Sequence, residues 1–346
     1  MGESPRLPMK ARNATLSEFE TAPNDTRDVP QSVDFSDKST RSDDMEDSLE
    51  EWISELQEAT EDARGAEVFR QWLDAQAKLH DYSPRNTALI HMQKPDASMV
   101  AGFWTWQNEF DRSVKEGESA IWIWRPNTIT AKKCPHCGNA PNYHEDNEDL
   151  NCPLAPDAPE QWDSEDPNEW TKGEILTGFS PAPVFDVSQT EGKPLPESPD
   201  TDAEAVEAGQ GEDVLTALQD AAREIGFPVE VVDVDEWDRD AKAIARTSED
   251  PPEIEIQDRD PAAAAGDLAH EIAHAVLHTG WDNPERPERE IEAEAVAYVV
   301  GRYFGLDTSG SKFYLAAWAG NEPEEITERM KTISNTAAKI IEAADD

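Results

Sequence analysis

The motif His270-Glu271-Ile272-Ala273-His274 contains the residue types of a metal-dependent hydrolase. The surrounding run is rich in Ala, Ile, Leu and Val and favours a helix, on which residues four apart share one face. Both imidazoles can therefore bind one Zn²⁺, and the intervening Glu271 is directed at a metal-bound water molecule. Because two unpaired histidines on a buried helix face would be costly, the motif predicts a catalytic zinc site.

A catalytic zinc needs a third protein ligand, and Gly280 stands where a longer form of this motif has a third histidine. The next helical segment offers Glu288, Glu290, Glu292 and Glu294. On a helical wheel, Glu292 falls inside the apolar arc, where a carboxylate needs a partner such as zinc. We therefore predict Glu292 as the third ligand, with Glu294 as the alternative.

All three cysteines of the chain, Cys134, Cys137 and Cys152, lie within 19 positions. C-x-x-C followed by a histidine and a third cysteine is typical of a structural Cys3His zinc site, in which four protein ligands leave no open position. We take His144 as the fourth ligand, because His136 lies between two chelating cysteines and is poorly placed to reach the same metal. The alternative is a loop with free thiols. The sequence thus predicts two zinc ions, one catalytic and one structural.

The segment 70–133 differs in charge from the rest of the chain. It contains nine basic residues against seven acidic ones, whereas the whole chain has 30 Lys and Arg against 75 Asp and Glu and a net charge of -45. Five of the 11 tryptophans lie in the same segment. A protein that binds single-stranded nucleic acid needs a segment with little net negative charge and with aromatic residues among its basic ones. The bases stack on the aromatic rings, while the cations follow the phosphate backbone. The alternative is that the alternating tryptophans form the core of a strand.

The remaining elements follow from the spacing of apolar residues. The pattern predicts helices over 49–80 with a break near Gly65, and over 84–92, 214–225, 262–279, 287–305 and the residues after Pro323. It predicts strands over 99–106, 120–124, 182–187, 229–234 and 254–257. The fold class is therefore α+β.

The composition and the start of the chain bear on the cellular location of the protein. No stretch approaches the ~18 apolar residues of a membrane-spanning helix, so we expect no membrane partner. The start of the chain lacks the apolar region of a secretory signal, which favours the cytoplasm. The acid excess favours a halophilic organism, because a dense carboxylate shell stays hydrated in concentrated salt.

Changes in composition predict two domains. We expect a disordered acidic leader over 1–48, an N-terminal domain over 49–200 with an acidic and cysteine-bearing insertion at about 130–178, a Gly- and acid-rich linker over 201–212, and a C-terminal domain over 213–346.

The runs HEIAHAVLH and EIEAEAVAYVVGRYFGLD resemble the ImmA/IrrE-type zincin metallopeptidases over roughly residues 213–320. That resemblance implies a mostly helical, gluzincin-type domain with His270, His274 and Glu292 as zinc ligands. It also implies that Glu271 is the general base, which takes a proton from water and passes it to the leaving amine.

The runs YSPRN, VAGFWTW and PVFDVSQTEG are similar to the N-terminal single-stranded-DNA-binding domain of ArdC-type antirestriction proteins, over about residues 66–200 with one large interruption. Such proteins also carry a C-terminal zincin domain, so the two resemblances agree. Residue chemistry then selects six candidates for DNA contact: Tyr82, Arg85, Asn86, Gln93, Trp106 and Lys115.

These observations together predict a single-stranded-DNA-binding protein with a zinc-dependent metallopeptidase domain and a role in antirestriction or DNA protection. Its partners would be single-stranded DNA and a protein or peptide substrate. The alternative is a non-catalytic antirestriction protein that uses the zincin domain as a scaffold. The intact Glu271 between both histidines favours catalysis.

Overall fold

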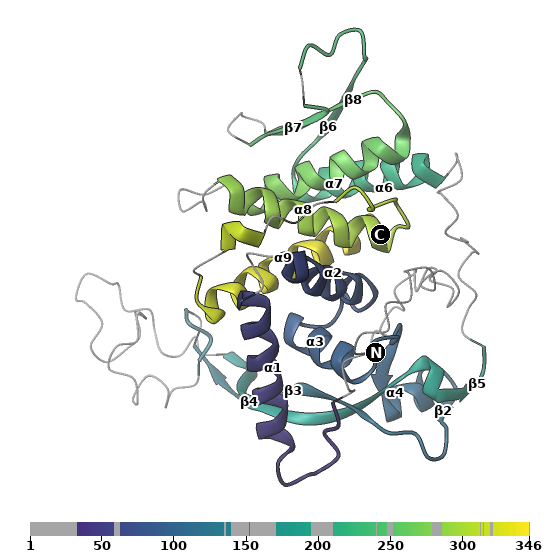
Figure 1. The fold of residues 1–346 in the computed structure, drawn as a ribbon, viewed down its shortest axis with the longest axis vertical. Helices are drawn as coiled ribbons and strands as arrows, with labels where there is room; N and C mark the ends of the chain where they lie inside the picture. Colours follow the sequence, from purple (N-terminus) through teal and green to yellow (C-terminus); the bar gives the residue numbers. More distant parts are fainter. Residues whose placement is uncertain are drawn as a thin grey trace. The chain divides into compact units, whose positions relative to one another are not determined.

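The computed structural model describes residues 33–58, 63–134, 136–139, 152, 171–194, 210–239, 241–247, 252–278, 286–311, 313, 315–318 and 321–345 (Figure 1). Its helices are α1 (Arg41–Glu58), α2 (Ala63–Lys78), α3 (Pro84–Gln93), α4 (Phe103–Asn108), α6 (Gln210–Ile225), α7 (Pro261–Leu277), α8 (Arg286–Tyr303) and α9 (Pro323–Asp345), with the 3-10 turns η3 (Val187–Gln189) and η4 (Leu315–Trp318). Its strands are β1 (Val100–Gly102), β2 (Arg112–Val114), β3 (Ile121–Lys133), β4 (Thr171–Asp186), β5 (Thr190–Gly192), β6 (Val229–Val232), β7 (Ala243–Arg246) and β8 (Glu253–Gln257). In the described part of the chain, no helix is long and apolar enough to cross a membrane.

The chain divides into two compact units, and the division differs from the predicted pair of domains. The main unit comprises Met1–Ile121 together with Pro183–Asp346, and the ribbon unit comprises Trp122–Ala182. Helices from both predicted domains therefore belong to one unit. The region expected to be a leader also contributes to it, because α1 begins at Arg41, and both Phe35 and Met45 are buried.

The core of the main unit joins residues that are far apart in the sequence. The Phe69 ring on α2 lies 5.5 Å from that of Phe313 and 5.2 Å from that of Trp318. Two polar contacts also connect α2 with α8, since Asp74 accepts hydrogen bonds from the Tyr298 hydroxyl (2.9 Å) and from Arg302 Nε (3.0 Å). The helix α2 is thus an integral part of the core around α8.

A small sheet covers α7 on the side away from these contacts. It has the order β6-β8-β7, with β6 parallel and β7 antiparallel to β8. Figure 1 shows this sheet beside α6 and α7. The middle strand β8 was predicted, and so was β6, but the edge strand β7 has only four residues and gives a weak alternating pattern.

The segment predicted as a strand over 99–106 is a strand only in its first half. Only Val100–Gly102 forms β1, which pairs with Val184–Asp186 of β4, and α4 begins at Phe103. Aromatic residues two apart share a face on a strand but point about 200° apart on a helix. The same sequence therefore buries Trp106 and leaves Trp104 69% exposed.

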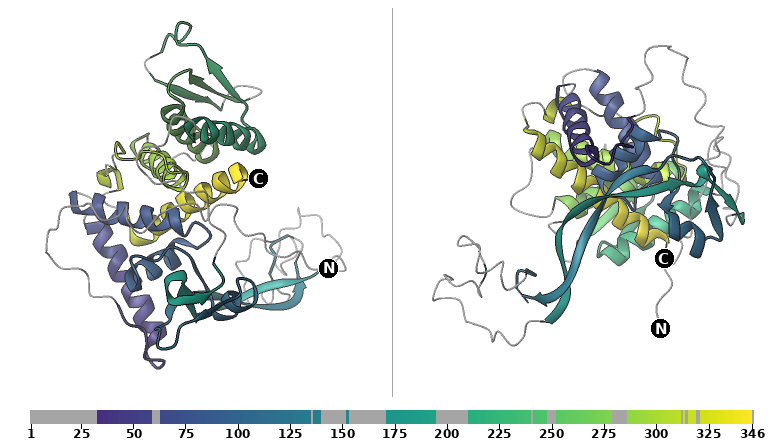
Figure 2. Two further views of the ribbon diagram at one scale, coloured as in Figure 1. Left: turned by 90° about the vertical axis from the view of Figure 1, so that its right-hand side faces the viewer. Right: turned by 90° about the horizontal axis from the view of Figure 1, so that it is seen from below.

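The ribbon unit is built on two strands. Figure 2 shows β3 and β4 running together as a long twisted ribbon. The Thr177 hydroxyl donates to the Asn127 carbonyl, while Gly173 lies against the Lys133 side chain. The two strands therefore run in opposite directions, and Cys134 follows the last residue of β3 at one end of the ribbon.

Candidate metal centre

Helix α7 presents the His-Glu-x-x-His motif from a firmly anchored position. Its N-terminus is capped by Asp260, whose side chain accepts the Ala263 backbone N–H, and Pro261 takes the first helical position. One face of the helix is buried through residues with small or aliphatic side chains, namely Ala264, Ala265, Leu268, Ala269, Ile272, Ala273 and Ala275. The opposite face then holds His270, Glu271 and His274 half-buried.

Three ligand atoms converge between α7 and α8. The Nε2 atoms of His270 and His274 lie 3.0 Å apart, and Glu290 Oε2 lies 3.6 Å from each of them. A point about 2 Å from all three atoms exists in this triangle, close to the Zn–N and Zn–O distances of about 2.0–2.2 Å. The donor set thus fits a divalent metal, and Glu290, with its side chain 52% exposed, leaves one side of the site open to solvent.

Glu294 holds the first histidine in the required orientation. Its Oε2 lies 3.3 Å from His270 Nδ1, and its carboxylate also accepts a hydrogen bond from Ser311. The proton on Nδ1 leaves the Nε2 lone pair of neutral His270 directed toward His274 and Glu290. The pKa of Glu294 is lowered, chiefly by the hydrogen bond with His270.

The pKa values of the two histidines shift in opposite directions. Burial and the neighbouring charge of His270 lower the pKa of His274 to about 4, so this ring is neutral and ready to bind a metal at pH 7. Burial by itself would lower the pKa of His270, but the hydrogen bond with Glu294 and the nearby carboxylates outweigh it and raise that pKa. A metal ion would therefore compete with a proton for His270.

Glu271 lies next to the ligand atoms and is held by the sheet. Its Oε2 accepts the backbone N–H of Ala245 on β7 at 2.7 Å. Burial raises the pKa of Glu271, despite the opposing effects of His270 and of that hydrogen bond. A carboxylate whose pKa is raised toward neutrality is suited to accept a proton and to return it.

Glu292, the third ligand predicted from the sequence, is not brought to the two histidines. Its carboxylate forms an ion pair with Arg329 of α9 at 2.5 Å, and its side chain is only 6% exposed. Arg329 also contacts Glu288 at 2.9 Å. The apolar arc of α8 does need a partner for its buried carboxylate, but a guanidinium supplies it. Glu290 lies close to the two histidines instead, and Glu294, the alternative ligand, contacts His270.

A spacing in the sequence could have identified this arrangement. Glu290 and Glu294 are four residues apart, as His270 and His274 are, so each pair lies on one face of its helix. Two such faces can meet when the helices pack side by side, as α7 and α8 do.

Replacing Glu294 by Gln should lower the affinity for zinc by about 10- to 100-fold, because an amide holds the His270 ring less firmly than a carboxylate does. Competition with a chromogenic chelator measures this change. Glu224, which is exposed on α6, provides the matched control as Glu224→Gln. An unchanged affinity in Glu294→Gln would show that this carboxylate does not orient the ligand.

The structure also brings the three cysteines together. The sulfur atoms of Cys134, Cys137 and Cys152 all lie within 4.8 Å of one another. His144, the predicted fourth ligand, lies outside the described residues. The choice of His144 therefore stays a prediction.

The six residues predicted to contact DNA are mostly structural. Trp106 is fully buried and its Nε1 donates to the Phe185 carbonyl at 2.8 Å, so no base can stack on it in the folded protein. The Tyr82 hydroxyl donates to the Val100 carbonyl, and burial raises its pKa to about 12. Asn86 is buried within α3, and Gln93 bonds to the Leu89 carbonyl of the same helix.

The two cationic candidates are more accessible. Arg85 is partly exposed but forms an ion pair with Glu46. Lys115 is exposed, and its Nζ donates to the Ser188 carbonyl. The aromatic side chains that do face solvent on α4 are Trp104 and, at 42% exposure, Phe103, whose rings meet edge to face at 5.3 Å. Neither was selected from the sequence.

Comparisons with known proteins find a curated relative and similar solved structures. No protein-family model matches the chain. The uncharacterized protein pXO2-81 of Bacillus anthracis is 25% identical over 284 residues, which cover 78% of this chain and 46% of the relative. The chain thus spans about half the length of the curated relative that it matches.

The two similar structures are both of the antirestriction protein ArdC from plasmid R388. The metal-free structure has a TM-score of 0.42 and 17% identity, and the match covers 76% of this chain and 85% of ArdC. The Mn(II)-bound structure has a TM-score of 0.45 and 14% identity, with 86% and 97% covered.

Proposed function

We propose that the chain is a metal-dependent peptidase. The observation that supports this most is the convergence of His270, His274 and Glu290 on one point, with Glu271 beside them. A divalent metal such as Zn²⁺, held by these three residues, would supply Lewis-acid activation of water and of the peptide carbonyl. The open side at Glu290 gives a substrate access to the site.

The protein's own groups have separate roles in this proposal. Glu271 accepts a proton from a water molecule in the site and delivers it to the leaving amine. Glu294 keeps the His270 ring in place, and the Ala245 N–H keeps the Glu271 carboxylate in place. Since β7 is an edge strand of its sheet and contacts Glu271, an extended peptide beside it would have its scissile bond near the base.

The test is the cleavage of an unstructured protein, such as reduced casein, by the purified full chain. Hydrolysis should require a divalent metal, stop when a chelator removes it, and resume when zinc is restored. The alternative, a binding protein with a non-catalytic zincin scaffold, predicts metal binding at the same residues without any cleavage.

We propose in addition that the protein binds single-stranded DNA through Trp104 and Phe103. The supporting observation is that these neighbouring rings are 69% and 42% exposed in a chain that buries Trp72 and Trp106. With a net charge of -45, the chain as a whole repels phosphates, so stacking on exposed rings would contribute most of the affinity. Duplex DNA hides its base faces, and single strands should therefore be preferred.

Variants of the two tryptophans on α4 distinguish DNA binding by exposed rings from a purely structural role. Trp104→Ala should lower the affinity for an oligothymidine by about 10-fold without changing stability, because base stacking contributes about 1–3 kcal/mol per base. Trp106→Ala should instead lower the free energy of unfolding by about 3–5 kcal/mol, as loss of a buried ring does. Fluorescence anisotropy and thermal unfolding measure the two effects. Wild-type affinity in Trp104→Ala would remove these rings from the DNA interface.

Antirestriction or DNA protection is the biological role that we propose for these activities. The support is the motif resemblance to ArdC-type proteins, above all the runs YSPRN and PVFDVSQTEG. The test is protection of plasmid DNA from a restriction endonuclease in cells that express the chain, with the Glu271→Gln variant showing whether protection needs catalysis.

A further inference from the structure

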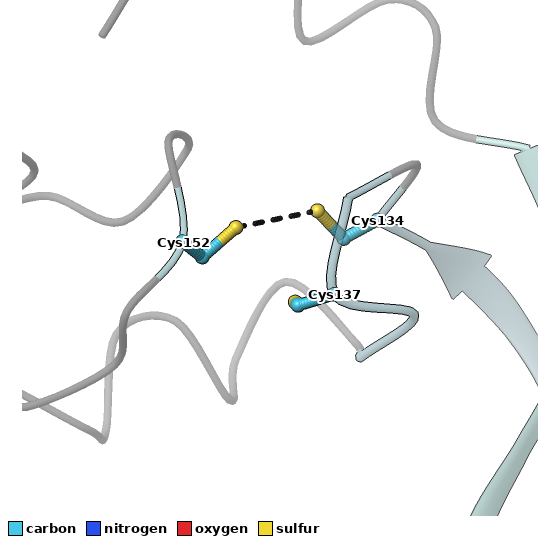
Figure 3. Close-up of side chains that lie close together, drawn as sticks. All are labelled: Cys134, Cys137 and Cys152. Atoms are coloured by element: carbon cyan, nitrogen blue, oxygen red, sulfur yellow. Dashed lines mark hydrogen bonds between the residues drawn. The ribbon is translucent and has the colours of Figure 1, made fainter. Parts of the chain in front are cut away.

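The end of the β3–β4 ribbon carries a group of sulfur atoms that the proposed peptidase does not use. Figure 3 shows the Cys134 and Cys152 side chains pointing toward each other, with Cys137 beside them on the loop that follows Cys134. Cys134 and Cys152 are 2% and 3% exposed. All three sulfurs lie within 4.8 Å of one another, and none of them belongs to a disulfide.

The distance between the two buried sulfurs fits a shared metal. Cys134 Sγ and Cys152 Sγ are 3.7 Å apart. Two thiolates on a tetrahedral zinc, each about 2.3 Å from the metal, lie about 3.8 Å apart. A disulfide would instead require an S–S distance of about 2.05 Å.

The loop around Cys134 is shaped to present its sulfur. The Gly138 N–H donates to the Cys134 carbonyl at 3.0 Å, and the Cys134 N–H donates to the Asn139 carbonyl at 2.9 Å. Gly138 has a φ of 75°, a conformation that favours glycine. The backbone N–H groups of His136 and Cys137 point at Cys134 Sγ and donate hydrogen bonds to it. Amides directed at a sulfur stabilise the thiolate form that binds metals.

The described part of the ribbon unit buries few apolar side chains. Among its described residues, the buried apolar side chains are Ile123, Ala182, Cys134 and Cys152, whereas its large apolar residues Ile129, Leu176 and Phe179 are more than half exposed. Where few apolar side chains are buried, a bound metal can supply stability as a cross-link. Two of these four buried side chains are cysteines, so a metal held by them would lie where the described residues are best packed.

We propose that Cys134, Cys137 and Cys152 bind one Zn²⁺ as thiolates, and that this zinc cross-links the end of the β3–β4 ribbon. The site is independent of the peptidase centre, because its ligands belong to a different unit and are sulfur rather than nitrogen and oxygen. Three thiolates at such short distances repel one another unless a cation lies between them. Zinc binding and the folding of the ribbon end are therefore coupled.

The experiment isolates this site in the full chain by removing the other one. The double variant His270→Ala/His274→Ala, purified under reducing conditions, should retain one equivalent of zinc. Adding Cys137→Ser should lower the zinc content from one equivalent to none. Ser180→Ala, which removes a hydroxyl of the same ribbon, is the matched control and should keep the zinc. Loading with Co²⁺ should give the thiolate-to-cobalt charge-transfer absorption.

A second readout keeps the test informative if a cysteine variant folds poorly. Chelation of the double variant should raise hydrogen exchange in residues 122–138 and 171–182, while α7 and α8 stay protected. A double variant without zinc, cobalt spectra without the charge-transfer band, or a Cys134–Cys152 disulfide under reducing conditions would each overturn the proposal.

Discussion

Replacing Glu271 by Gln is expected to lower the rate of peptide hydrolysis by about 10²- to 10⁴-fold, the usual contribution of a general base. The amide has the same size as the carboxylate, and its oxygen can still accept the Ala245 N–H that holds the side chain. It cannot accept a proton from water. The zinc affinity should stay unchanged, because Glu271 is not among the three converging ligand atoms.

The measurement is the initial rate of casein cleavage by zinc-loaded protein, with metal content determined on the same samples. Glu224→Gln is again the control for an exposed Glu-to-Gln change. If Glu271→Gln cleaved as fast as the wild type, the base would have to be another group and the proposed mechanism would fail.

The second large effect concerns two glutamates on α8 that are only two residues apart. Glu290→Gln should remove an anionic ligand and lower the zinc affinity by at least about 100-fold, beyond the 10- to 100-fold typical of changes outside the ligand set. The fold should remain intact, because the Glu290 side chain is 52% exposed.

Glu292→Gln should instead lower the stability of the fold and leave the zinc affinity intact. Its carboxylate is buried and paired with Arg329, so the amide weakens a charge-assisted contact and lowers the free energy of unfolding by about 2 kcal/mol. The remaining contact of Arg329 with Glu288 limits the loss. Zinc titration and chemical unfolding of both variants distinguish the roles. Loss of zinc in Glu292→Gln with retention in Glu290→Gln would restore the ligand set predicted from the sequence.

The sequence predicted that His270 and His274 lie together, but it placed Glu292 rather than Glu290 beside them. Spacing alone placed His270 and His274 on one face of a helix, and the structure brings their Nε2 atoms together. The wheel for α8 assumed that its apolar arc faces the metal. That helix packs against α7, α9 and α2, and Glu292 pairs with Arg329 of α9 rather than with the histidines of α7. Which face meets which neighbour depends on packing that no local pattern reports.

The same limit applies to the tryptophans and to the domains. The alternation of Trp104 and Trp106 fits a strand or a short helix, and only the observed helix exposes one ring and buries the other. The linker composition at 201–212 suggested a boundary, but composition does not reveal that Phe69 packs against Phe313 and Trp318. Contacts across some 240 residues are a property of the folded chain.

The aromatic cluster that includes Phe69 bears on how this protein could evolve. A gene segment for residues 213–346 would carry the metal ligands but leave Phe313 and Trp318 without the α2 surface that covers them. If such a segment were transferred to another protein without α2, it would expose an apolar face that favours aggregation.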